Sequence, residues 1–83
     1  MKPVLRVSFV DGTVRSVPLV AADIVAFERK FEIPMDKIER FEHLCFLAHH
    51  SEFRTKNTVQ ELDAWLELVD GVDFDDSPKD SSL

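Results

Sequence analysis

The pair Asp11-Gly12 is the feature that most constrains how this chain can fold. It separates two runs rich in β-branched and apolar residues, at positions 4–10 and 13–17. Asp-Gly between such runs predicts a β-hairpin with a two-residue type I′ turn, because both central residues of that turn need positive φ. One face of the hairpin would then be buried and would carry Leu5, Val7, Phe9 and Val14. The other face would carry Arg6, Ser8 and Arg15.

An amphipathic segment at residues 22–31 predicts the first helix after the hairpin. Its apolar residues Ile24, Phe27 and Phe31 recur at the spacing of one helix face. Asp23 falls in the first turn, where a carboxylate suits the positive end of the helix dipole. The charged residues between them predict a solvated outer face.

Two further helices are expected, at residues 36–53 and 58–69. The second helix would start at Asp36 as its N-cap. Its centre at 44–48 is apolar almost all round, so we expect it to be buried on several sides and to form the spine of the fold. The third helix would end at Gly71, a residue suited to a left-handed C-cap. Its apolar stripe comprises Val59, Leu62, Leu66 and Val69, widened by Trp65 and Leu68.

These segments predict a small α+β fold in which an N-terminal β-hairpin packs on three α-helices, in the order ββααα. A hairpin alone is marginally stable in water, so it needs this packing. We expect residues 1–70 to form one small α+β domain and residues 71–83 to form an acidic tail. From Asp70 onward there are five aspartates and one lysine, which is most of the net charge of −6.

The composition excludes several classes of protein. With 16 acidic and 10 basic residues, the chain is poorly suited to nucleic acid, whose binding depends on neutralising phosphates with Lys and Arg. No signal segment is visible, and no apolar run approaches the ~20 residues of a membrane span. The single Cys45 cannot form an internal disulfide. We therefore expect a soluble cytoplasmic protein without nucleic-acid or membrane partners.

No residue pattern in the chain predicts catalysis, a cofactor or a metal. Cys45 and His49 could present two ligands on one helix face, but a zinc site usually needs three or four. The chain has only two glycines, Gly12 and Gly71, so no glycine-rich phosphate loop can form. A thiol on an apolar helix is usually inert packing. We expect a non-enzymatic protein.

Residues of the third helix and the acidic tail are the candidates for binding a partner. Trp65 is the single tryptophan, and two interpretations stay open: it completes the core, or it anchors an interface. The candidate partner-binding residues are Trp65, Leu68, Val72, Asp73, Phe74, Asp75 and Asp76. On this interpretation, deleting residues 71–83 should leave a folded domain that loses a partner.

Three stretches of the chain, at residues 22–31, 44–50 and 62–72, give it a resemblance to a known family. They read ADIVAFERKF, LCFLAHH and LDAWLELVDGV, and they follow the Asp-Gly hairpin. In this order they resemble the small tail assembly chaperones of long-tailed (siphovirus-type) actinobacterial phages. The second block of that family often reads Leu-Ala-Trp-His, and His49 stands here in place of the tryptophan.

The resemblance implies a non-enzymatic function in phage assembly. Chaperones of this family bind the tape measure protein, whose long apolar helices would otherwise aggregate, and help to recruit tail tube subunits. They work in the cytoplasm of the host cell and are absent from the finished virion. An edge strand of the hairpin could also pair with a second copy and form a homo-oligomer.

Two other functions remain open at this point. The chain could be a structural virion protein, such as a head–tail connector or a tube-associated protein. It could instead be an acidic inhibitor that mimics nucleic acid, which would require carboxylates spread over one folded face. The concentration of aspartates from Asp70 onward argues against the mimic.

Overall fold

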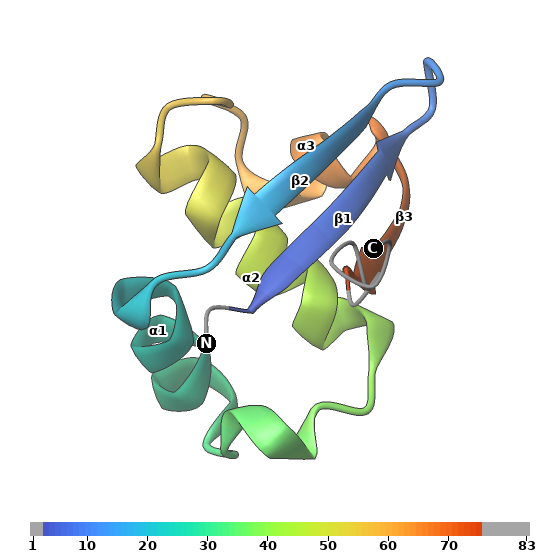
Figure 1. Ribbon diagram of the computed structural model, residues 1–83. Helices are drawn as coiled ribbons and strands as arrows, with labels where there is room; N and C mark the ends of the chain where they lie inside the picture. Colours follow the sequence, from blue (N-terminus) through green and yellow to red (C-terminus); the bar gives the residue numbers. More distant parts are fainter. Residues whose placement is uncertain (1–2, 76–83) are drawn as a thin grey trace, which may run out of the picture.

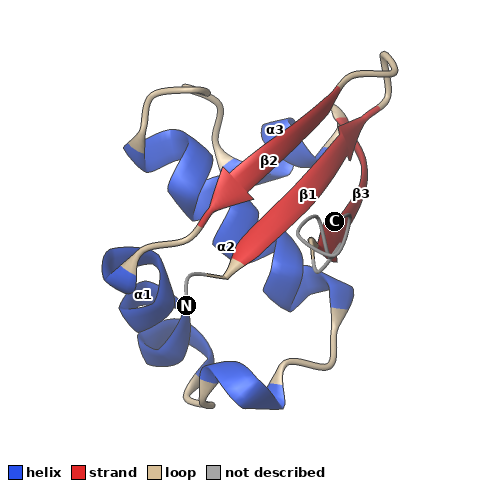
Figure 2. Cartoon of the chain, in the orientation of Figure 1, coloured by secondary structure: helices blue, strands red, loops and turns tan. Residues whose placement is uncertain are grey.

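A three-stranded antiparallel sheet with helices on one of its faces makes up the fold in the computed structural model, which describes residues 3–75 (Figure 1). The strand order is β2-β1-β3, so the first strand of the chain lies in the middle (Figure 2). The strands are β1 (Val4–Phe9), β2 (Val14–Pro18) and β3 (Val69–Phe74). The helices are α1 (Ala21–Phe31), the short 3-10 helix η1 (Met35–Lys37), α2 (Phe41–Arg54) and α3 (Leu62–Leu66).

The α+β class is confirmed, but the predicted order ββααα is wrong at its end. The third helix begins only at Leu62 and stops at Leu66, and the chain then extends into β3. β3 pairs with the edge of β1 that the hairpin leaves open, and Val72 lies opposite Val7. Gly71 is a strand residue in this arrangement and does not cap a helix. The domain boundary expected after residue 70 falls inside β3, and residues 76–83 of the expected tail lie outside the described residues.

The hairpin forms as predicted, but its register differs by one residue. Phe9 donates its N–H to the carbonyl of Thr13 (2.8 Å), and the Gly12 N–H donates back to the carbonyl of Phe9 (2.9 Å). The loop therefore has three residues, with Gly12 at φ 95°. Asp11 fixes this loop, because its Oδ1 accepts hydrogen bonds from both the N–H and the hydroxyl of Thr13.

The one-residue shift exchanges the faces of β2. Val17 lies opposite Leu5 and is buried, whereas Val14 lies opposite Ser8 and is 59 % exposed. The assignment of Val14 to the buried face is therefore wrong. Arg15 is wrongly placed too, since it lies opposite Val7 and reaches buried Glu52 on the helical side of the sheet.

Replacing Gly12 with alanine should destabilise the protein by about 1 kcal/mol, because an L side chain is strained at positive φ. A Cβ on Gly12 would meet no atom within 4 Å, so the cost is conformational and not steric. The midpoint of urea unfolding measures it. Gly71→Ala is the matched control: that site is equally open and its φ is not positive, so no such loss is expected. Equal midpoints for the two variants would contradict this account of the loop.

The predicted second helix is divided into two pieces. η1 is a single turn, residues 38–40 are not helical, and α2 begins only at Phe41. The expected N-cap at Asp36 is therefore wrong, and Arg40 takes that position with an extended backbone. Met35 and Ile38 explain the break, because this shape lets both side chains pack against the core.

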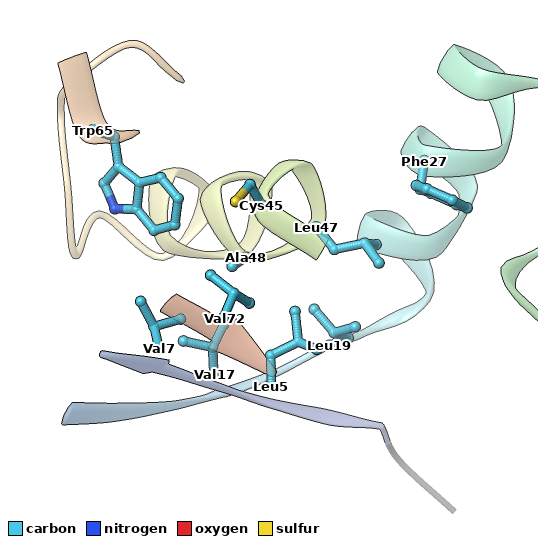
Figure 3. Packing of buried hydrophobic residues seen from close by; sticks show 10 residues of the cluster. All are labelled: Leu5, Val7, Val17, Leu19, Phe27, Cys45, Leu47, Ala48, Trp65 and Val72. Atoms are coloured by element: carbon cyan, nitrogen blue, oxygen red, sulfur yellow. The ribbon is translucent and has the colours of Figure 1, made fainter. Parts of the chain in front are cut away.

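The core lies between α2 and the sheet, and α2 is its spine as predicted. Figure 3 shows Leu47 and Ala48 of α2 between the strands and the flanking helices. Phe27 fills the end of the core near α1, and Trp65 fills the opposite end. Trp65 is therefore a core residue in this fold. The buried apolar cluster comprises Leu5, Val7, Val17, Leu19, Phe27, Cys45, Leu47, Ala48, Trp65 and Val72.

Candidate functional site

The residues predicted to bind a partner fall into buried and exposed groups. Trp65 and Val72 are buried, with only 1 % and 2 % of their surface exposed. Leu68 and Phe74 are 44 % and 42 % exposed, and both belong to the surface. Of the three remaining candidates, Asp73 is exposed and Asp76 lies outside the described residues. Asp75 is partly buried and donates its backbone N–H to the Val4 carbonyl (2.7 Å).

The structure separates Leu68 from Phe74 by placing them in two different grooves. Leu68 and Trp65 line a groove of about 420 Å³ at the loop end of the hairpin, here called the hairpin-end groove. Its other lining residues are Phe9, Val10, Asp11, Thr13, Arg15, Asn57 and Thr58. Phe74 lines a groove of about 480 Å³ at the edge of β3, here called the β3-edge groove. Its other lining residues are Pro3, Met35, Asp36 and Ile38.

The hairpin-end groove is held together by contacts between the hairpin and the segment after α3. The Val10 N–H donates to the Leu68 carbonyl (2.9 Å), which fixes these two exposed apolar side chains beside each other. Below them the rings of Phe9 and Trp65 meet edge to face, with centroids 6.4 Å apart. The half-exposed Arg15 guanidinium lies 4.9 Å from the centre of the Phe9 ring. The groove can therefore hold an apolar side chain next to a cation.

The indole N–H of Trp65 is the one buried side-chain donor that has no hydrogen-bond partner within residues 3–75. Figure 3 shows the indole nitrogen on the side of the ring turned away from Cys45. A buried polar group without a partner costs stability. Trp65 therefore fills the core, but its unpartnered indole N–H lowers the stability of the fold.

Sequence reasoning missed a third groove, which lies over α2 and the start of α3 and is here called the helix groove. It has a volume of about 400 Å³. It is lined by Phe46, His49, His50, Phe53, Arg54, Glu61 and Leu62. His49 donates from Nε2 to the Gln60 carbonyl (2.8 Å) and so ties the segment before α3 to α2. The spacing of Phe46, His50 and Phe53 along one helix face is the sequence signal that could have indicated it.

A buried ion cluster, also missed, holds α1 against α2 beside the helix groove. Asp23 is fully buried and accepts hydrogen bonds from His50 Nδ1 (2.6 Å) and from Nε and Nη2 of Arg54 (3.1 and 2.9 Å). It also accepts a bond from the Val20 N–H (2.9 Å), which caps the start of α1. Nothing in the sequence distinguishes these three residues from ordinary surface charges, because their contacts join residues 27 and 31 positions apart.

The environment of Asp23 keeps its carboxylate ionised. Burial by itself raises the pKa of Asp23, but hydrogen bonds from the guanidinium, a backbone amide and the imidazole outweigh that effect. The pKa of Asp23 is therefore held below its ordinary value of 3.8. Its charged hydrogen bonds fix the two side chains that line one end of the helix groove, His50 and Arg54.

Cys45 and Ser51, two side chains that could act as nucleophiles, are both buried. Burial raises the pKa of Cys45 to about 11, so its thiol stays protonated at neutral pH and is a poor nucleophile. Ser51 donates its hydroxyl to the Pro18 carbonyl (3.1 Å) and is buried. Within residues 3–75, no group of three or more His, Cys, Asp or Glu side chains could hold a metal ion.

No protein-family model, curated protein or solved structure matches this chain. In the described part of the chain, none of the helices has the length and apolar character needed to cross a membrane.

Proposed function

We propose that this protein is a phage tail assembly chaperone, a non-enzymatic protein that binds the tape measure protein and helps to recruit tail tube subunits. The proposal starts from the resemblance of residues 22–31, 44–50 and 62–72 to that family. One structural observation carries it: large hydrophobic side chains remain exposed on a very small fold, and four of them line grooves. Eight of them in the described part are at least 42 % exposed: Val10, Val14, Val25, Phe41, Phe53, Val59, Leu68 and Phe74.

Exposed apolar side chains beside grooves indicate a surface that binds another protein. Leu68, Phe74 and Phe53 each line a different groove, so the described residues offer several shallow sites. Shallow apolar grooves suit the apolar faces of helices, which dock in this manner in many complexes. A protein that escorts a long helical partner and later leaves it needs contacts of this spread-out, reversible kind.

Replacing Leu68 with aspartate should weaken binding to the tape measure protein. The substitution puts a charge in the hairpin-end groove without touching the buried core, because Leu68 is exposed. When the two proteins are co-expressed, we expect the soluble fraction of the tape measure protein to fall by roughly half or more. Val25→Asp is the control, since Val25 is 42 % exposed on α1 but lines none of the three grooves.

Two outcomes would contradict the proposal. In the first, the wild-type chain leaves the co-expressed tape measure protein insoluble. In the second, mass spectrometry of purified phage particles detects the chain in constant proportion to the tail proteins, which would favour a structural virion protein. An assembly chaperone is expected in the host cytoplasm and not in those particles.

A further inference from the structure

The helix groove has an aromatic floor in which Phe53 is exposed and Phe46 and His50 are partly buried. Phe46 and Phe53 lie seven residues apart on α2, and His50 lies between them on the same face. The Phe46 ring packs edge to face on Phe31 of α1, with centroids 5.5 Å apart. Leu62 of α3 closes the other side of the groove, and Phe53 is 45 % exposed. This floor can accept two turns of apolar side chains from another helix.

Two cationic side chains beside this floor, Lys30 and Arg54, have N–H donors that a partner can use. The ammonium group of Lys30 lies 5.7 Å from the Phe31 ring centre and 5.9 Å from that of Phe46, and Lys30 forms no salt bridge with any residue from 3 to 75. Arg54 uses Nε and Nη2 on Asp23, while its Nη1 makes no hydrogen bond to the described residues. Arg54 is 33 % exposed, so a partner can reach it. Among the residues that line the groove the one carboxylate is Glu61, and it is set against the guanidinium of Arg54 and the nearby ammonium of Lys30.

We infer that the helix groove binds an amphipathic helix of the partner protein that carries carboxylates beside its apolar stripe. The apolar stripe would cover Phe46, Phe53 and Leu62. The carboxylates would pair with the ammonium group of Lys30 and with Nη1 of Arg54, whose planar guanidinium suits such contacts. A basic helix would bring like charges to the same two positions and would be disfavoured. The identity of the partner as the tape measure protein rests on the proposed function, whereas the chemistry of the groove does not.

Two synthetic peptides test the inference on the full-length protein. Both carry leucines at i, i+3, i+4 and i+7 on a helical scaffold; one has glutamates beside the stripe, and the other has lysines at the same positions. Binding is followed by the fluorescence anisotropy of a labelled peptide. We expect the glutamate peptide to bind and the lysine peptide to bind about tenfold more weakly or not at all, with the difference shrinking as salt is raised.

Matched substitutions identify the groove as the site. Phe53→Ser should weaken the glutamate peptide about tenfold, while Phe41→Ser should leave it unchanged, because Phe41 is an equally exposed phenylalanine of α2 outside the groove. Lys30→Glu should weaken it several-fold and Arg29→Glu should not. These charge variants keep the test decisive if Phe53→Ser does not fold, and circular dichroism checks each variant.

Equal binding of the two peptides, or equal effects of Phe53→Ser and Phe41→Ser in folded proteins, would overturn the inference. The proposed function can fail separately. A glutamate peptide that binds as expected, together with a tape measure protein that stays insoluble, refutes the chaperone and supports the groove. A tape measure protein that is solubilised equally well by Phe53→Ser, Lys30→Glu and the wild type places the chaperone's site elsewhere.

Discussion

A chain truncated after Asp70 will not fold, whereas a chain truncated after Asp75 will. The first truncation removes most of β3 and takes Val72 out of the core. Burying one valine contributes about 1.5 kcal/mol or more, and its loss also uncovers Leu5 and Val7 on the central strand. A domain of this size usually has only about 4 to 12 kcal/mol of stability. What remains of the sheet is a two-stranded hairpin, and its packing on the helices lacks the contribution of Val72.

The truncation after Asp75 is the matched control, because it keeps every strand pairing of the described sheet. Circular dichroism and the dispersion of amide signals in NMR spectra distinguish the two chains. A cooperative unfolding transition for residues 1–70 would show that β3 is dispensable. The expected result reverses the interpretation drawn from sequence, in which residues 71–83 could be removed without loss of the fold.

Asp23→Ala should destabilise the protein by about 3 kcal/mol, the next largest effect expected of a single change. The substitution leaves Arg54 and His50 without their carboxylate and removes the acceptor for the Val20 N–H. Removing one member of a buried ion pair typically costs 3–5 kcal/mol, and the low end applies because the side chains of Arg54 and His50 are partly exposed. Urea unfolding measures the change. Asp63→Ala, in the exposed first turn of α3, should change stability by less than about 0.5 kcal/mol.

The same carboxylate predicts how stability depends on pH. Because the pKa of Asp23 is lowered in the folded state, its contribution is fully present above the unfolded value, near 3.8, and is lost as pH falls through the lower folded value. The wild type should therefore lose stability in acid below about pH 4, and Asp23→Asn should lose less over that range. Parallel stability curves for the two proteins would show that Asp23 is not held ionised.

Sequence reasoning predicted the parts of the fold that local patterns determine. The Asp-Gly turn, the apolar centre of α2 and the stripe of α1 are each readable within about a dozen residues. The register of the hairpin was not, because Asp11-Gly12 fits both a two-residue and a three-residue loop. The choice depends on which residues of β2 the core can bury. In the observed register Val17 is buried, Val14 is exposed, and Arg15 reaches Glu52 on the helical side of the sheet.

β3 and the ion cluster were missed because both depend on distant partners. Residues 69–74 contain Gly71 and two aspartates, which disfavour strands, and only the apolar pair Val72 and Phe74 hints at alternation. The strand forms because β1 offers it an open edge. From sequence alone, Asp23 is explained as a carboxylate at the positive end of the helix dipole. The hydrogen bond from Arg54 appears only in the folded structure. Of the predicted partner-binding residues, Leu68, Asp73 and Phe74 are on the surface, and the helix groove was not foreseen.

The central position of β1 has a consequence for how the protein is made. β1 is synthesised before its two neighbours in the sheet, and one of them, β3, is almost the last described segment to be made. Closing the sheet therefore brings together residues from opposite ends of the chain, which is a slow kind of contact to form. Until then the hairpin has a free edge and an unfinished apolar face, so nascent chains are vulnerable to strand pairing with one another.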